Sequence, residues 1–392
     1  DYRLAFDDKG KVFVAGTAST GAASGLGVWK IDSANMTVLA STIVFSAEGG
    51  ELSAGRPSVD SSGAVWVPAA ESVAGGYRYD LFRFGSGLGL SAGYPRTYQR
   101  GGGVDGGLAT AIDSAGSLWT VGVSSDAATN KLDLALWKHD ASGGIVPGFP
   151  VFWPDAYKNL DTVRADLALN AANNRLWLSA QKNFDTCADP QAALLSYDLN
   201  GVLVSSALWH ADAGGAAAGN AVLDGADGVW TSGSVGSTSV IWRYDASGAL
   251  LSGYPKAFSG GASFGALALD SAGTAWVLQG DKPVLFLPGP VQAGAAGAAV
   301  CSVAGMGRIS GVLTSPAGFP VGNATVAVSS TLFQGGEPHM FLFASTGGTT
   351  LPYTLDLQAP ATYSIVAIAA DLTAAQPTPG TQVGVYADYA PV

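Results

Sequence analysis

The feature that most constrains this chain is a repeat whose second strand carries a bulky aromatic residue. Each copy contains four short apolar runs separated by turns rich in Gly, Asp and Ser, and the copies follow one another at intervals of 46 to 58 residues. Four short strands per copy are the content of one β-propeller blade, so six copies predict six blades. The recurring aromatic residues are Phe13, Trp66, Trp119, Trp177, Trp230 and Trp276.

An acidic turn precedes the aromatic residue in most copies. Asp opens a tight turn by accepting backbone N–H groups, and Gly supplies a positive φ, so the phrase Asp-x-x-Gly predicts a structural rather than a catalytic acid. In the fourth copy Asn170 to Asn174 replaces the phrase, and in the fifth it reads Asp224 to Gly228. Both of these turns are expected to hold one extra residue. The regular pairs are Asp7/Gly10, Asp60/Gly63, Asp113/Gly116 and Asp270/Gly273.

A second phrase marks the third strand of each copy, as in Trp137-Lys138-His139-Asp140 and Trp242-Arg243-Tyr244-Asp245. With Tyr79 to Phe84, these phrases resemble the units of the bacterial extracellular β-propeller repeat family. The resemblance covers about residues 3 to 290. It implies the fold and says little about activity, because such repeats occur in many unrelated surface proteins.

The sixth copy departs from the others at its end. Three strands are predicted over residues 265–270, 274–280 and 284–287, and a Gly/Ala-rich stretch with a poor strand signature follows at 291–300. Either that stretch supplies the fourth strand of the blade, or an edge is left for another segment to pair with.

The residue pattern of the sequence changes after Met306. Alternating segments such as Arg308 to Leu313, Ala324 to Val328 and Tyr363 to Ala367 predict a half-buried β-sandwich. They resemble the carboxypeptidase-regulatory or transthyretin-like fold. The predicted fold class is therefore all-β: a six-bladed β-propeller over residues 1–302, followed by a small Ig-like or transthyretin-like β-sandwich over residues 303–392.

The charge of the chain excludes several kinds of partner. It carries a net charge of −11, only 12% of its residues are charged, and no Lys/Arg cluster occurs. A nucleic-acid partner is therefore not expected. Every apolar stretch is interrupted before the roughly 18 residues that a membrane span needs.

Several features favour a secreted, cell-surface-associated protein. The sequence starts at Asp1 without a leader, as a processed protein would. Cys187 and Cys301 are the two cysteines, and they are either a disulfide or two buried thiols. Asn35 and Asn323 stand in glycan acceptor motifs.

No catalytic set is evident. His139, His210 and His339 are far apart without companions at ligand spacing, so neither a metal site nor any cofactor is predicted. The fourth copy alone has an irregular polar link to its predecessor, placed on the face where blade links and loops between second and third strands emerge. The candidate ligand-binding residues in this link are Asp155, Tyr157, Lys158, Asp161 and Arg164.

These observations predict a non-enzymatic structural or adhesive protein that self-associates through strand edges or domain surfaces, on the cell surface or in a filament. A glycan or a surface protein is the other expected partner. The alternative is a monomeric module that binds a glycan or peptide, and a third reading is a propeller hydrolase or lyase.

Overall fold

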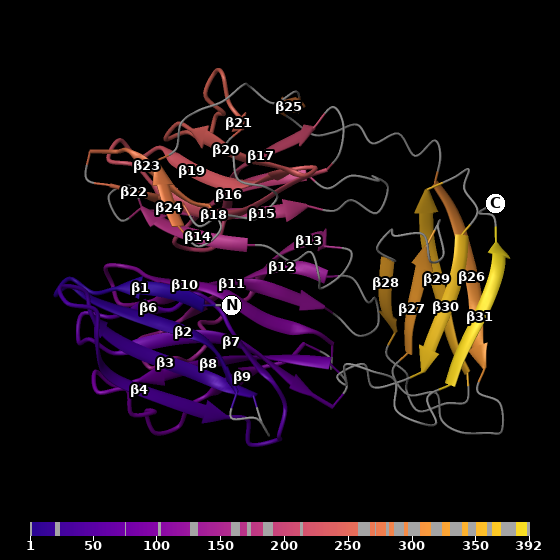
Figure 1. Ribbon diagram of the computed structural model, residues 1–392, viewed down its shortest axis with the longest axis horizontal. Coiled ribbons are helices and arrows are strands. Elements are labelled where there is room, and N and C mark those ends of the chain that lie inside the picture. Colours follow the sequence, from indigo (N-terminus) through magenta and orange to yellow (C-terminus); the bar gives the residue numbers. More distant parts are fainter. Residues whose placement is uncertain are drawn as a thin grey trace.

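The structure is a computed structural model, and it is all-β: every regular element among the described residues is a strand (Figure 1). It describes residues 2–19, 24–74, 76–100, 103–125, 132–157, 165–170, 174–182, 191–211, 215–257, 267–270, 272–279, 282–285, 294–296, 306–314, 324–329, 339–343, 350–358, 363–369 and 382–389.

Three antiparallel sheets follow one another over the first 157 residues. The first contains β1 (Tyr2–Phe6), β2 (Lys11–Ser19), β3 (Ser24–Asp32) and β4 (Thr37–Phe45). The second contains β5 (Leu52–Ala54), β6 (Ser58–Val59), β7 (Val65–Val73), β8 (Gly76–Phe84) and β9 (Arg96–Tyr98). The third contains β10 (Asp105–Ile112), β11 (Leu118–Ser125), β12 (Leu132–His139) and β13 (Val151–Tyr157).

Three more sheets follow. The fourth contains β14 (Ala165–Asn170), β15 (Arg175–Lys182), β16 (Gln191–Asp198), β17 (Leu203–Ala211) and, from far along the chain, β25 (Gly294–Ala296). The fifth contains β18 (Ala216–Leu223), β19 (Val229–Val235), β20 (Thr238–Tyr244) and β21 (Lys256–Ala257). The sixth has β22 (Leu267–Leu269), β23 (Ala275–Gln279) and β24 (Lys282–Leu285).

The Gly/Ala-rich stretch does not complete the sixth sheet within the described residues. Its strand β25 instead pairs antiparallel with β17, placing Trp209 opposite Ala296 and Ala211 opposite Gly294. β25 therefore covers the end of β17 at the outer edge of the fourth sheet. Such an edge otherwise presents unpaired backbone groups.

The remaining strands pair only with one another. β26 (Met306–Thr314) pairs with β29 (Thr350–Gln358), and a second sheet has the order β28 (His339–Phe343), β27 (Ala324–Ser329), β30 (Tyr363–Ala369) and β31 (Gln382–Tyr389). Figure 1 shows this group, coloured orange to yellow, beside the six sheets.

The acidic turns have the same geometry in the second, third, fifth and sixth sheets. In the third, Asp113 Oδ1 accepts the N–H groups of Ala115 and Ser117 at 3.0 and 2.8 Å, and Oδ2 accepts the indole N–H of Trp119 at 3.0 Å. The sequence predicts the turn but not this third bond, which fixes the orientation of the core indole. The equivalent acid and indole pairs are Asp60/Trp66, Asp224/Trp230 and Asp270/Trp276.

One prediction about these turns is wrong. The turn of the fifth sheet has no extra residue, because Asp224 Oδ1 accepts the N–H of Gly228 four residues on, as Asp113 accepts that of Ser117. Asp227 occupies the left-handed position that glycine takes elsewhere, with φ of 62°. Asp tolerates this conformation better than most residues.

Apolar clusters fill the spaces between neighbouring sheets. Phe13, Val28, Val65 and Phe82 join the first sheet to the second. Their burial fixes the spacing of β2, β3, β7 and β8 and thereby places the polar residues at the ends of these strands.

Candidate functional site

Most of the predicted ligand-binding residues lie outside the described residues, so the site in this link stays a prediction. Asp155 and Tyr157 lie in β13. Lys158, Asp161 and Arg164 lie outside the described residues, as do Cys187, Cys301 and Asn323. Asn35 is exposed, and its Oδ1 accepts a hydrogen bond from the Thr37 hydroxyl at 2.7 Å.

His139 is buried, which agrees with its predicted structural role. Its Nε2 lies 3.0 Å from the Tyr79 hydroxyl and its Nδ1 lies 3.3 Å from the Gly143 carbonyl. Burial lowers the pKa of His139 to about 4, so the ring is neutral near pH 7.

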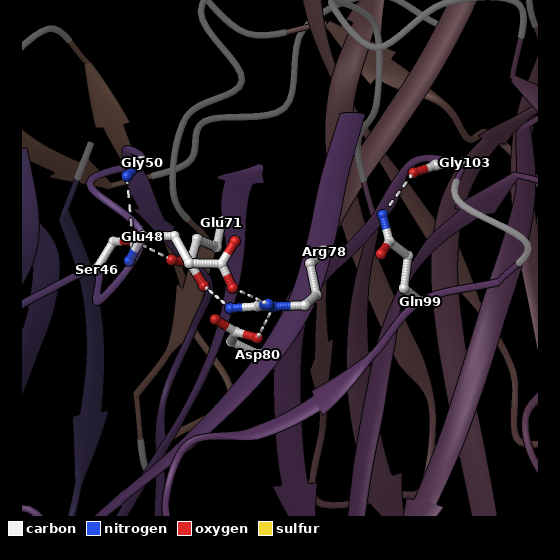
Figure 2. Close-up of polar contacts among 8 residues, drawn as sticks. All are labelled: Ser46, Glu48, Gly50, Glu71, Arg78, Asp80, Gln99 and Gly103. Atoms are coloured by element: carbon white, nitrogen blue, oxygen red, sulfur yellow. Dashed lines mark hydrogen bonds and ion pairs between the residues drawn. The ribbon is translucent and has the colours of Figure 1, made fainter. Parts of the chain in front are cut away.

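A group of ionisable side chains lies where the link after the first sheet meets the second sheet, and it is centred on Arg78 (Figure 2). Arg78 Nη1 contacts Glu48 Oε1 at 2.7 Å, Nε contacts Asp80 Oδ1 at 3.0 Å, and Nη2 donates to Glu71 Oε2. One guanidinium thus binds three carboxyl groups. We call Ser46, Glu48, Glu71, Arg78 and Asp80 the Arg78 cluster.

Strand alternation and register bring the inner members together. Arg78 and Asp80 are two residues apart on β8 and therefore point to the same side of the sheet. Glu71 on β7 stands directly opposite Arg78 in the antiparallel register. Cross-strand partners of opposite charge are close enough to pair.

The outer members come from the link that follows β4. Ser46 Oγ donates to Glu71 Oε1 and accepts the N–H groups of Glu48 and Gly50, both at 3.0 Å. A Cβ on Gly50 would lie 1.8 Å from the Ser72 carbonyl oxygen, so only glycine allows this close approach. The link therefore holds Glu48 at the rim of the cluster.

The cluster has a buried interior and a solvent-exposed rim. The side chains of Asp80 and Glu71 are 0% and 3% exposed, whereas those of Arg78 and Glu48 are 21% and 54% exposed. Glu48 and Arg78 are therefore more exposed to solvent than the two buried acids.

The pKa values of the two buried acids are shifted in opposite directions. Burial, the hydrogen bond with Glu71 and the charge of Glu71 raise the pKa of Asp80 to about 8, against the opposing effect of Arg78. Burial alone would raise the pKa of Glu71, but hydrogen bonds from Asp80, Ser46 and Arg78 lower it. Asp80 Oδ2 is buried and no donor binds it. A proton on this oxygen, shared with Glu71, explains why the pKa of Asp80 is raised and that of Glu71 is lowered.

A second polar group lies in the third sheet and the link before it. Asp105 Oδ2 accepts the N–H of Arg100 at 2.7 Å, and Arg100 Nη1 contacts Asp133 Oδ2 at 2.9 Å. Burial raises the pKa of Asp105 to about 6. In the same region Gln99 Nε2 donates to the Gly103 carbonyl at 3.5 Å (Figure 2).

A third ion pair links sheets that are not neighbours. Arg56 follows β5, and its Nε donates to Asp166 Oδ1 in β14 at 2.8 Å. Asp166 Oδ2 accepts the N–H of Ala221 in β18 at 3.2 Å. All of these polar atoms have partners, so the pair joins the second, fourth and fifth sheets.

Sequence reasoning missed the Arg78 cluster. Tyr79-Asp80 matched the repeat pattern and was taken as part of the fold, and no motif in the sequence singled out Glu48 or Glu71. The signal that was present is the crowding of Glu71, Arg78 and Asp80 on two adjacent strands of a chain with so few charged residues.

Two features are absent from the described residues. These residues contain no group of three or more His, Cys, Asp or Glu side chains placed to hold a metal ion. Nor is any helix long and apolar enough to cross a membrane found among them.

The chain was compared with known proteins. No family model and no curated protein matches it. A solved structure of a Lactobacillus plantarum protein matches with 14% identity and a TM-score of 0.48, covering 74% of this chain and 85% of that one.

Two further solved structures are those of enzymes. A Xanthomonas campestris gluconolactonase matches with 12% identity and a TM-score of 0.38, covering 74% of this chain and 85% of its own. An exo-beta-1,3-galactanase from Phanerochaete chrysosporium matches with 11% identity and a TM-score of 0.39, covering 99% of this chain and 93% of its own.

The fold of this chain is all-β and β-propeller-like, as its six successive antiparallel sheets show. The predictions of a non-enzymatic structural or adhesive protein, and of a chain that is not an enzyme, are contradicted by neighbours that are enzymes, and we set both aside. Self-association and a glycan partner have no support from the comparisons. At such low identity the likeness concerns the fold and assigns no activity to this chain.

Proposed function

We propose that this protein is a hydrolase that cleaves a C–O bond of a hydroxylated substrate by acid catalysis in the Arg78 cluster. One arrangement carries the proposal: two adjacent buried carboxyl groups, Glu71 and Asp80, bind the same guanidinium in surroundings that shift their pKa values in opposite directions. The pKa of Asp80 is raised to about 8, while that of Glu71 is lowered. Pairs of acids whose environments push their pKa values apart mark acid and base roles in enzymes.

Each residue has a defined role. Protonated Asp80 gives its proton to the leaving oxygen as the C–O bond breaks, and ionised Glu71 stabilises the positive charge that develops on carbon. A water molecule then adds to that carbon and returns a proton to Asp80, as paired carboxyl groups do in glycoside hydrolysis. Arg78 Nε and Nη2 hold the two acids in place. A substrate would approach at the rim, where Glu48 is exposed.

Aryl glycosides and aryl esters test this function. We expect turnover that falls as the pH rises through the pKa of Asp80, because the acid then loses its proton. Asp80→Asn is expected to lower kcat by about 100-fold or more, the usual contribution of a general acid. Asp105→Asn is the matched control, since Asp105 is also a buried Asp with a raised pKa but lies outside the cluster.

Two outcomes oppose the proposal. Full activity in Asp80→Asn removes the role of the acid, and an equal loss in Asp105→Asn shows that damage to the fold explains the effect. Circular dichroism of each variant separates misfolding from lost chemistry.

For the architecture, we propose a six-bladed β-propeller over residues 1–302 and a β-sandwich over residues 303–392. The six consecutive sheets and the exclusive pairing of β26 to β31 support this division. Limited proteolysis followed by mass spectrometry tests the boundary: two stable fragments that meet near residue 302 are expected, and early cleavage throughout either part would contradict it.

A further inference from the structure

One side of the first sheet is apolar and exposed to solvent. Phe13 packs toward the second sheet, so its strand neighbours Val12 and Val14 point to the opposite side. In the registers that join β1 to β4, every residue on this opposite side is uncharged. We call this side the open face. Its exposed large side chains are Tyr2, Leu4, Phe6, Val38, Ile43 and Phe45.

The open face is large enough to need an explanation. Tyr2 and Phe6 are 68% and 67% exposed, and the ring of Tyr2 lies edge-on to that of Trp29 with 6.0 Å between centroids. Figure 1 shows the four strands of the first sheet side by side, in indigo, so the face extends from β1 to β4. A contiguous apolar surface of this kind marks an interaction site.

The repeat itself indicates what covers such a face. In the first five sheets the aligned aromatic residue of the second strand packs against the sheet that follows. Each of these side chains is at most 7% exposed. They are Phe13, Trp66, Trp119, Trp177 and Trp230.

Trp276, the aligned aromatic residue of the sixth sheet, is the exception. Its indole N–H donates to Asp270 Oδ2 at 3.0 Å, as in the equivalent turns, yet the side chain is 39% exposed. Its neighbours Ala275 and Val277 are buried against the fifth sheet, so Trp276 points away from that sheet. No seventh repeat follows in the sequence, and in a ring the next sheet is the first.

We propose that the first and sixth sheets close on each other, with Trp276 packed against the open face, and that this seam is open in the structure described above. The open face matches the face that the second sheet presents to Phe13, because Val14 and Trp29 stand where Val67 and Phe82 stand there. Closure rests on the six-bladed architecture proposed above and is independent of the hydrolase chemistry.

Burial favours the closed form. Apolar surface that leaves water stabilises packing in proportion to its area, and both faces of the seam are apolar. A charged side chain on the open face would lose its water when the sheets close, which costs free energy. In the open form the same side chain stays hydrated. A charge placed there therefore shifts the equilibrium toward the open form.

Hydroxyl-radical footprinting, with oxidation of each tryptophan read by mass spectrometry, tests the closure. In the wild type we expect Trp276 to react about as slowly as Trp230, which is 7% exposed. Leu4→Asp puts a charge on the open face and is expected to raise the rate of Trp276 about fivefold or more. Val204→Asp is the matched control, because Val204 is 48% exposed against 49% for Leu4 and lies on β17, away from both faces.

Each result supports or refutes the seam. A wild-type Trp276 that reacts several-fold faster than Trp230, or a rate that is equal in the two Asp variants, refutes closure. Protection of Trp276 only at high protein concentration assigns the open face to a second copy and also refutes it. Stable fragments that meet near residue 302, together with a reactive Trp276, would keep the two-part architecture and refute the seam.

Trp119 is the internal reference for folding, because its side chain is fully buried. If Leu4→Asp makes Trp119 reactive as well, that variant has unfolded, and Leu4→Ser is compared with Val204→Ser instead. We then expect the faster oxidation of Trp276 in Leu4→Ser, and equal rates in the two Ser variants would refute closure.

Discussion

Trp119 donates its indole N–H to Oδ2 of Asp113 at 3.0 Å, and both residues are buried. The acid that closes the turn thus also orients a core tryptophan of the sheet.

Asp113→Ala is expected to lower the free energy of unfolding by about 2 to 3 kcal/mol, because three hydrogen bonds to a charged oxygen pair are lost and a buried indole N–H is left without an acceptor. Urea denaturation followed by tryptophan fluorescence measures the change. Asp270→Ala, in the exposed equivalent turn, is expected to lose clearly less. Equal losses in the two variants would contradict the role of burial.

The link at Gly50 offers a second test. A Cβ there would lie 1.8 Å from the Ser72 carbonyl oxygen, so Gly50→Ala is expected to cost about 1 to 3 kcal/mol by overpacking and to displace Glu48 from Arg78. Gly89→Ala is the control, since a Cβ at Gly89 meets nothing within 4 Å. Thermal unfolding of both variants gives the comparison, and an unchanged midpoint for Gly50→Ala would be inconsistent with the described packing.

Removing the guanidinium of Arg78 should destabilise the fold more than removing one acid does. Arg78→Met leaves Glu71 buried and unpaired, and we expect a loss of about 2 to 4 kcal/mol after allowing for the partial exposure of Arg78. Combining it with Glu71→Gln is expected to recover part of this loss, because the unpaired charge is then absent. A double-mutant cycle in urea measures the coupling, and strictly additive losses would argue against it.

The stability of the protein should depend on pH in a window set by Asp80. Its pKa is raised from an ordinary 3.8 to about 8, so between these values the folded protein holds a proton that the unfolded chain releases. The free energy of unfolding is therefore expected to fall as the pH rises from 5 to 8, by about 1 kcal/mol per unit at most. Glu71, whose pKa is lowered, contributes stability that is lost only at acid pH.

Urea unfolding at pH 5, 6, 7 and 8 measures this slope. Asp80→Asn is expected to flatten it, leaving a smaller part that ends near pH 6 and comes from Asp105. Asp140→Asn is the control, because hydrogen bonds in an exposed turn lower the pKa of Asp140 and keep it ionised throughout the window. An identical slope in the wild type and Asp80→Asn would rule out the raised pKa.

The sequence was sufficient to predict features that depend on neighbouring residues. The turns opened by Asp60 and Asp113 follow from the hydrogen-bonding capacity of Asp and the freedom of Gly, and the strands follow from apolar runs between these turns. The orientation of Trp119 was not predicted, because it depends on which carboxylate oxygen remains free after the turn has formed.

Contacts between distant segments were beyond sequence reasoning. Glu48 meets Arg78 only because the first and second sheets pack together, and no local pattern specifies that distance. The pairing of β25 with β17 likewise passes over the whole fifth sheet. The prediction of an extra residue in the turn of the fifth sheet was wrong because Asp227 takes the left-handed backbone conformation that Gly usually takes.

The pairing of β25 with β17 also bears on how the molecule unfolds. The chain between these two strands forms a closed loop that contains the fifth and sixth sheets, and its ends meet at the edge of the fourth. Closing so long a loop costs chain entropy, which is recovered only when the sheets inside it are packed. The fourth, fifth and sixth sheets should therefore open together as one cooperative unit in amide hydrogen exchange.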